Sequence, residues 1–300
     1  IDQLKDFCKN NKIQSLGISD SHILSGALEF SESLSSVGTQ PIIGTQILFK
    51  YKDFIGFIPL IAKNMDGYKN IIELSSKSYL ENSDNTDPYC NFDDLLTKST
   101  GIIVLSGSIR CLLGNLFNKG LFNEIEDIVS KLSKSFSDDF YIEIQRHNDL
   151  NEKEFENFNL NISKKFNLPI IASNEVYYLN QNMFEAHDAL MCIGKKTYVN
   201  DPNRLKLSNE HYFKSSEEMI ELFSDLPEAL ENNFSLPYRC SFKPSNSKPI
   251  LPSISDNNVN TNDLLTKESL NGLNDKFKKN FKIDNKDLDS SKDYQDYKQR

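Results

Sequence analysis

The chain has 300 residues, 38% of them apolar, which is enough for one large or two ordinary domains with a buried core. Its 34 basic and 43 acidic residues give a net charge of −9 without a long Lys/Arg run, which argues against a basic face as a main grip on nucleic acid. Five cysteines without a CxxC pair indicate reduced thiols and a cytoplasmic location, and no apolar run reaches the ~18 residues of a membrane span, so we expect no membrane partner.

The first 173 residues alternate helical and strand patterns. Strands that alternate with helices of ordinary length predict a parallel α/β sheet or barrel. The expected strands are residues 15–18, 41–49, 54–62, 101–105, 140–144 and 169–172. The expected helices are residues 1–11, 25–37, 64–80, 109–136 with a break near Gly120, and 152–166, with a polar loop over 81–90 and a short helix capped by Asn91.

After Asn174 the character of the sequence changes. We expect helices over 183–193, 216–223 and 227–233, an extended segment over 236–252, a linker over 253–262 and a basic amphipathic helix over 264–281. The chain begins at Ile1 rather than Met and ends at Arg300 inside a charged, helix-like stretch. We therefore expect it to be a piece of a longer protein.

Several predicted strands end in residues that can bind metal. The first is followed by Asp20 and His22, at the place where α/β folds put catalytic side chains. Later strand ends bring His147 and Glu175, whereas Ser106 and Gly107 after residues 101–105 offer no strong ligand. Clustered His, Asp and Glu are what divalent metals for phosphoester chemistry require. The candidate metal residues are therefore Asp20, His22, His147 and Glu175.

A series of longer motifs occurs in one order along the chain. It resembles the PHP domain at the N-terminus of the bacterial replicative DNA polymerase III alpha subunit. The likeness covers about residues 1–252, and residues 264–281 resemble, less specifically, the first helix of the adjoining polymerase core. The motifs are Ser-Asp-Ser-His (19–22) with Gly-Ala-Leu-Glu-Phe (26–30), Glu-Ile-Gln-Arg-His (143–147), Ala-Ser-Asn-Glu-Val-Tyr (172–177), Glu-Ala-His-Asp-Ala-Leu (185–190), His-Tyr-Phe-Lys-Ser (211–215) and Leu-Phe-Ser-Asp-Leu-Pro-Glu-Ala-Leu (222–230).

The resemblance implies a distorted (β/α)7 barrel of the PHP type, with up to three metals at the C-terminal ends of its strands. It implies a PHP domain over 1–252, whose first strand with His-x-His would lie upstream, a linker over 253–262 and the start of the catalytic core over 263–300. In members with intact ligands the domain supports phosphoesterase or proofreading exonuclease activity. Other members have lost the ligands and keep the domain as structure.

Three positions of this sequence depart from the family's ligands. Ser21 stands for a ligating His, Gln46 for a Glu and Tyr177 for a His. Each change removes charge or donor strength from the cluster. The resemblance thus favours a structural platform with a degenerate metal site and no metal of its own. The alternatives are a residual phosphoesterase or 3′-5′ exonuclease that uses Zn or Mn at the four candidate residues, and a docking module for a partner subunit.

For the parent protein, the resemblance implies DNA-directed DNA synthesis, with Mg²⁺ bound beyond Arg300 and no catalytic residue for that reaction in this chain. Its partners would be DNA, deoxynucleotides and other replicase subunits such as the sliding clamp and a proofreading exonuclease.

Ordinary structural roles compete with each functional interpretation. Asp20 fits a turn or helix cap, His147 a hydrogen-bonded imidazole, and Glu175 a carboxylate satisfied by the backbone or a nearby Arg. Arg146 and Arg204 fit surface ion pairs, and the basic helix near 276–279 fits a solvated face.

Overall fold

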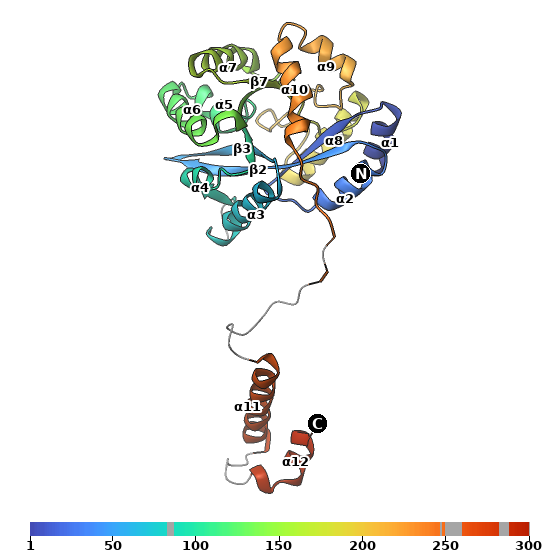
Figure 1. Cartoon of the computed structure of the whole chain (residues 1–300), viewed down its shortest axis with the longest axis vertical. Helices are drawn as coiled ribbons and strands as arrows, with labels where there is room; N and C mark the ends of the chain where they lie inside the picture. The colour runs from blue at the N-terminus through green and yellow to red at the C-terminus, as the bar shows by residue number, and fades with distance from the viewer. Residues whose placement is uncertain (83–86, 247, 250–259, 282–287, 300) are drawn as a thin grey trace. The chain divides into compact units, whose positions relative to one another are not determined.

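A computed structural model describes residues 1–300 except 83–86, 247, 250–259, 282–287 and 300. The chain divides into two compact units, residues 1–245 and residues 246–300 (Figure 1). The predicted domain boundary at 252 and most of the predicted linker over 253–262 lie outside the described residues.

The first unit is built on one curled, seven-stranded sheet of mixed direction. The strand order is β1-β2-β3-β5-β6-β7, and β4 pairs with β2 beside this path. β1 with β2, β5 with β6 and β6 with β7 are parallel, as the α/β pattern predicts. The strands are β1 (Ser15–Ser21), β2 (Gln40–Tyr51), β3 (Phe54–Ala62), β4 (Tyr89–Asn91), β5 (Ile102–Leu105), β6 (Phe140–Ile144) and β7 (Ile170–Ala172).

β3 is the departure from a parallel sheet, because it runs antiparallel to both β2 and β5. Strands β2 and β3 are joined by the short turn at Lys52 and Asp53, and so short a connection permits only an antiparallel pair. The residues expected to form only a loop over 81–90 also contribute to β4, which extends the β2–β3 hairpin. The predicted α/β fold is confirmed, with a mixed rather than parallel sheet.

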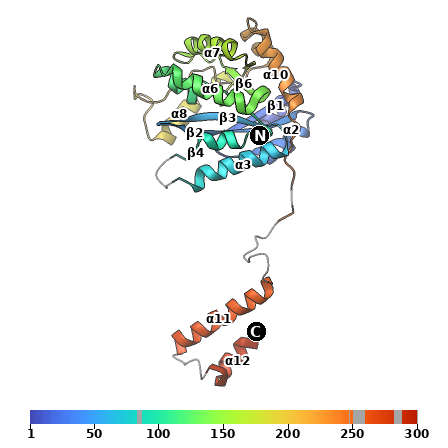
Figure 2. The same cartoon turned by 60° about the vertical axis from the view of Figure 1, so that its left-hand side comes forward.

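Helices flank the hairpin on opposite sides. Both views place α6 and α7 on one side of β2 and β3, and α3 and α4 on the other (Figures 1 and 2). The predicted break near Gly120 separates α5 from α6. The helices of this unit are α1 (Asp2–Asn10), α2 (Ala27–Ser35), α3 (Met65–Leu80), α4 (Phe92–Thr97), α5 (Leu112–Asn118), α6 (Phe122–Phe136), α7 (Glu152–Phe166), α8 (Phe184–Lys195), α9 (Ser216–Leu222) and α10 (Pro227–Arg239).

α10 is longer than the sequence predicts, because Pro237 lies inside its last turn instead of opening an extended segment. The helix packs against β7, where the Asn232 side chain donates to the Ile170 carbonyl at 2.8 Å. The side-chain amide of Gln40 donates to the backbone carbonyls of Pro237 and Cys240, at 2.9 and 2.8 Å. These bonds connect the end of α10 to the start of β2.

Alternate residues of the strands enter two separate cores. Phe140, Ile142 and Ile144 pack into the larger core with the helices, while Tyr141 packs into a smaller one. Side chains of successive strand residues point to opposite faces, so the odd positions of β6 face the inside of the curled sheet. Glu143 therefore lies on the same inner face as Tyr141.

The second unit contains α11 (Thr261–Phe281) and α12 (Lys292–Gln299). Phe277 of α11 and Tyr294 of α12 form a small apolar cluster with Leu288, which precedes α12. The predicted amphipathic helix over 264–281 is thus present. In the part of the chain that the structure describes, no helix combines the length and apolar character required to cross a bilayer.

Candidate functional site

The strand-end residues predicted from the sequence fall into two groups with separate neighbours. The first group lies where β1 and β2 pair in parallel. Ser21, the last residue of β1, stands opposite Gln46, and the His22 amide donates to the Gln46 carbonyl at 2.8 Å. Gln46 lies in the middle of β2 instead of at a strand end, because β2 continues beyond β1 as one arm of the hairpin.

His22 adopts a left-handed backbone conformation with φ of 67°. Its ring packs near Phe57 and Tyr79, with centroid distances of 5.1 and 6.2 Å, and its buried Nδ1 has no hydrogen-bond partner among the described residues. Burial lowers the pKa of this imidazole, and the nearby charge of Asp87 acts in the opposite direction. Asp20 is exposed, and its backbone carbonyl accepts from the Thr45 hydroxyl at 2.6 Å. In this group His22 is the one imidazole, and it packs against aromatic rings as an uncharged side chain would.

The second group surrounds the Arg110 guanidinium, in the connection between β5 and α5. One terminal nitrogen of Arg110 donates to Asp149 and the other to Glu175. His211 Nε2 lies 3.5 Å from both of these nitrogens. Three side chains of metal-ligand type therefore converge on a cation that belongs to the chain itself.

Secondary structure brings these residues together from distant parts of the sequence. Asp149 follows β6, and Glu175 follows β7. His211 reaches the site because residues 177–178 and 211–213 run side by side through an isolated parallel bridge, in which the Tyr177 amide donates to the His211 carbonyl at 3.0 Å.

The hydrogen bonds of His211 determine which of its nitrogens carries the proton. Nδ1 lies 3.0 Å from the Glu175 backbone carbonyl, which can only accept, so Nδ1 is protonated. In the neutral ring Nε2 then carries a lone pair, and it faces the guanidinium of Arg110. This is the nitrogen with which a neutral histidine would ligate a metal.

His147 belongs to the same group and stacks on His211, with ring centroids 4.1 Å apart and an interplanar angle of 5°. Its Nε2 lies 3.2 Å from the Glu175 amide and 3.0 Å from Asn174 Oδ1. Both rings are essentially buried, at 1% and 0% exposure. The sequence-based role of His147 as a hydrogen-bonded imidazole is what these contacts describe.

Tyr177, which the resemblance predicts to replace a ligating His, completes this group. Its hydroxyl donates to Glu175 Oε1 at 2.7 Å, and its ring stacks on His187 at 5.3 Å. Burial, followed by the negative charge of Glu175, raises the pKa of the phenol. Tyr177 therefore stays protonated and holds the carboxylate oxygen that Arg110 leaves free.

The electrostatics of the second group are those of a closed ion-pair network. Burial alone would lower the pKa of Arg110, but the charges of Glu175 and Asp149 outweigh it and raise the pKa. For Asp149, burial opposes ionisation, but the positive charge of Arg110 prevails, so its pKa is lowered. Both groups are therefore ionised at neutral pH.

The residues at the strand ends do not fit a divalent metal. Both carboxylates of the second group are already bound to Arg110, and Asp20 and His22 form no hydrogen bond or ring contact with that group among the described residues. Among residues 1–82, 87–246 and the other described segments, no set of three or more His, Cys, Asp or Glu side chains has the geometry of a metal site.

Sequence reasoning missed Arg110, Asp149 and His211. A pattern of metal ligands at strand ends does not include Arg110, because an arginine is not a metal ligand. A search of the strand ends for charges of both signs would have found Arg110 opposite Asp149 and Glu175.

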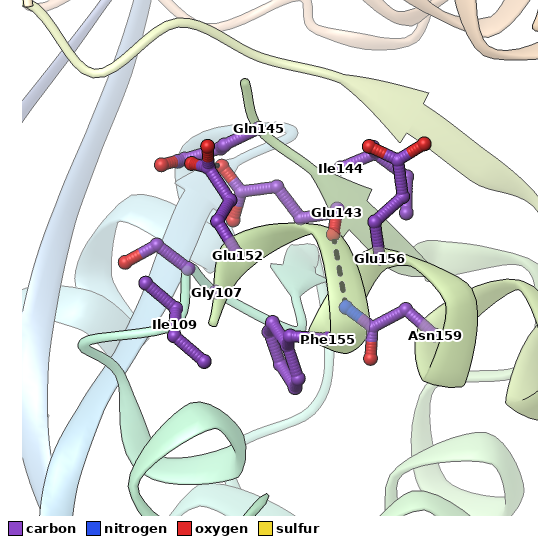
Figure 3. A pocket seen from close by; sticks show the side chains of 10 residues that line it. Gly107, Ile109, Glu143, Ile144, Gln145, Glu152, Phe155, Glu156 and Asn159 are labelled. Atoms are coloured by element: carbon purple, nitrogen blue, oxygen red, sulfur yellow. Dashed lines mark hydrogen bonds between the residues drawn. The ribbon is translucent and has the colours of Figure 1, made fainter. Parts of the chain in front are cut away.

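A small cavity of about 10 Å³ lies beside this network, large enough for about one water molecule. Figure 3 shows the side chains of Glu143, Gln145 and Glu152 gathered together, with the Asn159 amide donating to the Glu143 backbone carbonyl at 3.3 Å. Glu143 Oε1 accepts from Gln145 at 2.8 Å and from the Ser173 hydroxyl, whereas Oε2 has no hydrogen-bond partner in the part of the chain that the structure describes. Burial raises the pKa of this carboxyl, against the effect of its hydrogen bonds.

We expect Glu143→Gln to stabilise the protein increasingly as pH rises. A carboxyl whose pKa is raised on folding contributes stability below its unfolded pKa and loses it as pH rises through the folded pKa. Glutamine keeps the Oε1 acceptor and removes this loss. The difference in melting temperature between variant and wild type should grow from pH 4 to pH 8. Glu231→Gln, at an exposed position of α10, is the control. An equal difference at both pH values would contradict the prediction.

Comparison with known proteins agrees with this fold. A PHP domain model matches residues 1–147. Proteins named DNA polymerase III subunit alpha match nearly the whole chain: 33% identity over 91% of it in Rickettsia bellii, 34% over 95% in Rickettsia felis, and 36% over 81% in Borreliella burgdorferi. The chain spans only 22–24% of the length of these three relatives.

One solved structure, of a protein from Bifidobacterium adolescentis proposed to be a metal-dependent phosphoesterase, covers 57% of this chain and 80% of its own with a TM-score of 0.38 and 12% identity. That likeness is too low to support an argument about function. The strand-end motifs, the curled α/β sheet and the sequence matches agree with one another: residues 1–147 belong to the PHP domain family, and the chain is a relative of the bacterial DNA polymerase III alpha subunits.

Proposed function

We propose that this chain acts within a replicative DNA polymerase as a PHP unit that supports the polymerase structurally. The parent protein would catalyse DNA-directed DNA synthesis in the cytoplasm on DNA and deoxynucleotides, using Mg²⁺ held outside this chain. No residue of the chain is assigned to that reaction. The proposal rests on the relatives, which are 33–34% identical to this chain over 91–95% of the chain's length.

The observation that carries the structural role is the pairing of Arg110 with both Asp149 and Glu175. A hydrolytic metal centre needs carboxylates and imidazoles with free lone pairs directed at one point. Here the carboxylates bind a guanidinium, and Tyr177 donates to one of them as well. Serine at position 21 and glutamine at position 46 are weak ligands in place of the family's histidine and glutamate.

The test is the metal content of the protein, purified without chelator and measured by mass spectrometry. We expect zinc and manganese far below one ion per chain, and an unchanged melting temperature after dialysis against EDTA. One or more tightly held ions per chain, with a lower melting temperature after EDTA, would contradict the structural role. That result would support the phosphoesterase or 3′-5′ exonuclease, with Asp20, His22, His147 and Glu175 among the ligands.

Docking of a partner subunit, such as a sliding clamp or a separate proofreading exonuclease, is compatible with the platform. It is tested by whether such a subunit elutes with the purified protein in size-exclusion chromatography.

A further inference from the structure

The network around Arg110 has the composition of a cation-binding site. The Arg110 side chain is 27% exposed, and its two carboxylate partners are 11% and 21% exposed. The fully buried His211 turns Nε2 toward the same guanidinium. Two negative charges and one nitrogen lone pair thus face one positive group, in surroundings where an unpaired charge is costly.

The shape of the site is that of a guanidinium. The two terminal nitrogens of Arg110 each bind a different carboxylate, and both are 3.5 Å from His211 Nε2. A planar fork of donors matches acceptors spread along one edge, whereas a metal ion requires them around one point. This explains how His, Asp and Glu gather at the strand ends without forming a metal site among the described residues.

We propose that Asp149, Glu175 and His211 form a cation site whose resident cation is the Arg110 guanidinium. Removal of this side chain leaves an anionic site that accepts a free guanidinium ion. The proposal goes beyond the structural role, since it depends only on contacts within the first unit and holds whatever the parent protein does.

The test is chemical rescue of Arg110→Ala, followed by thermal unfolding at pH 7. The variant should melt below wild type, because Asp149 and Glu175 lose their counter-charge. Guanidinium chloride in the low-millimolar range should raise its melting temperature by about 2–4 °C over the same concentration of NaCl, as a ligand that binds only the folded state does. Wild type should gain nothing, since its site is filled.

The matched control is Arg110→Ala combined with Glu175→Gln, which removes one carboxylate and keeps its shape. Rescue should be lost in this double variant. Equal rescue of the single and double variants, or of wild type, would show a nonspecific salt effect and overturn the proposal. So would failure of guanidinium to raise the melting temperature of a folded Arg110→Ala.

Two further measurements keep the test decisive. If Arg110→Ala does not fold, Arg110→Lys is measured in its place, because it retains the charge. It should melt below wild type, since an ammonium lacks the planar fork that binds both carboxylates. A melting temperature of Arg110→Lys equal to that of wild type would overturn the requirement for a planar fork. Manganese chloride replaces guanidinium in a parallel series with Arg110→Ala. Rescue by manganese and not by guanidinium would identify a metal site and overturn the proposal.

Discussion

Gly67→Ala is expected to destabilise the protein by about 3 kcal/mol, because the position has no space for a side chain. A Cβ at Gly67 would lie 1.7 Å from the carbonyl oxygen of Gly101. The atoms that a Cβ would meet are backbone atoms of Gly101, the residue that precedes β5, so no flexible side chain can move aside. Chemical unfolding with urea measures the loss, and we expect a melting temperature lower by about 6–12 °C.

The matched control for this substitution is Gly194→Ala. Gly194 lies inside α8, and a Cβ there meets nothing within 4 Å. Alanine in a helix interior is more favourable than glycine by about 0.5–1 kcal/mol, so this variant should be slightly more stable than wild type. If both variants changed stability in the same direction, close packing at Gly67 would not be the cause.

Phe223→Ala is expected to cost about 3–5 kcal/mol, the range for removal of a buried aromatic side chain. Phe223 is 0% exposed, and the Arg146 guanidinium lies 4.8 Å from its ring centroid. Arg146 also pairs with Glu156 and Asp225, so the ring supports the contact between α7 and the end of α9. Urea unfolding of wild type and variant gives the difference.

Phe234→Ala is the control for Phe223→Ala, because Phe234 is 65% exposed. Its substitution should change stability by less than about 0.5 kcal/mol. A comparable loss in both variants would show that burial of Phe223 is not what stabilises the region around Arg146.

Much of the fold could be predicted from local pattern. Apolar runs such as residues 101–105 and 140–144 are strands, and the break near Gly120 separates two helices. The antiparallel direction of β3 could be inferred only from the short turn at Lys52. The strand predicted over 41–49 is present as β2, and its extension to Lys50 and Tyr51 comes from pairing with Ile55 and Phe54 of β3, contacts that a local pattern does not contain.

Some roles of individual residues could likewise be predicted from the sequence, and others could not. Glu175 satisfied by an arginine and Arg146 in an ion pair are confirmed, since both follow from the cost of leaving a charge unpaired. Arg204 pairs with Asp188, and both side chains are nearly buried rather than on the surface. Asp20 forms no helix cap in the described structure, because the N-cap of α2 is Gly26 and no side chain caps that helix.

The sequence by itself determined the family resemblance and the α/β class, since these depend on residue types in order along the chain. Only the tertiary structure decided what the remaining ligand-type side chains do. Arg110, Asp149, Glu175 and His211 are separated by up to 101 positions, and their roles follow from distances that the fold alone sets. A carboxylate beside a guanidinium forms an ion pair, whereas the same carboxylate beside two imidazoles could serve as a metal ligand.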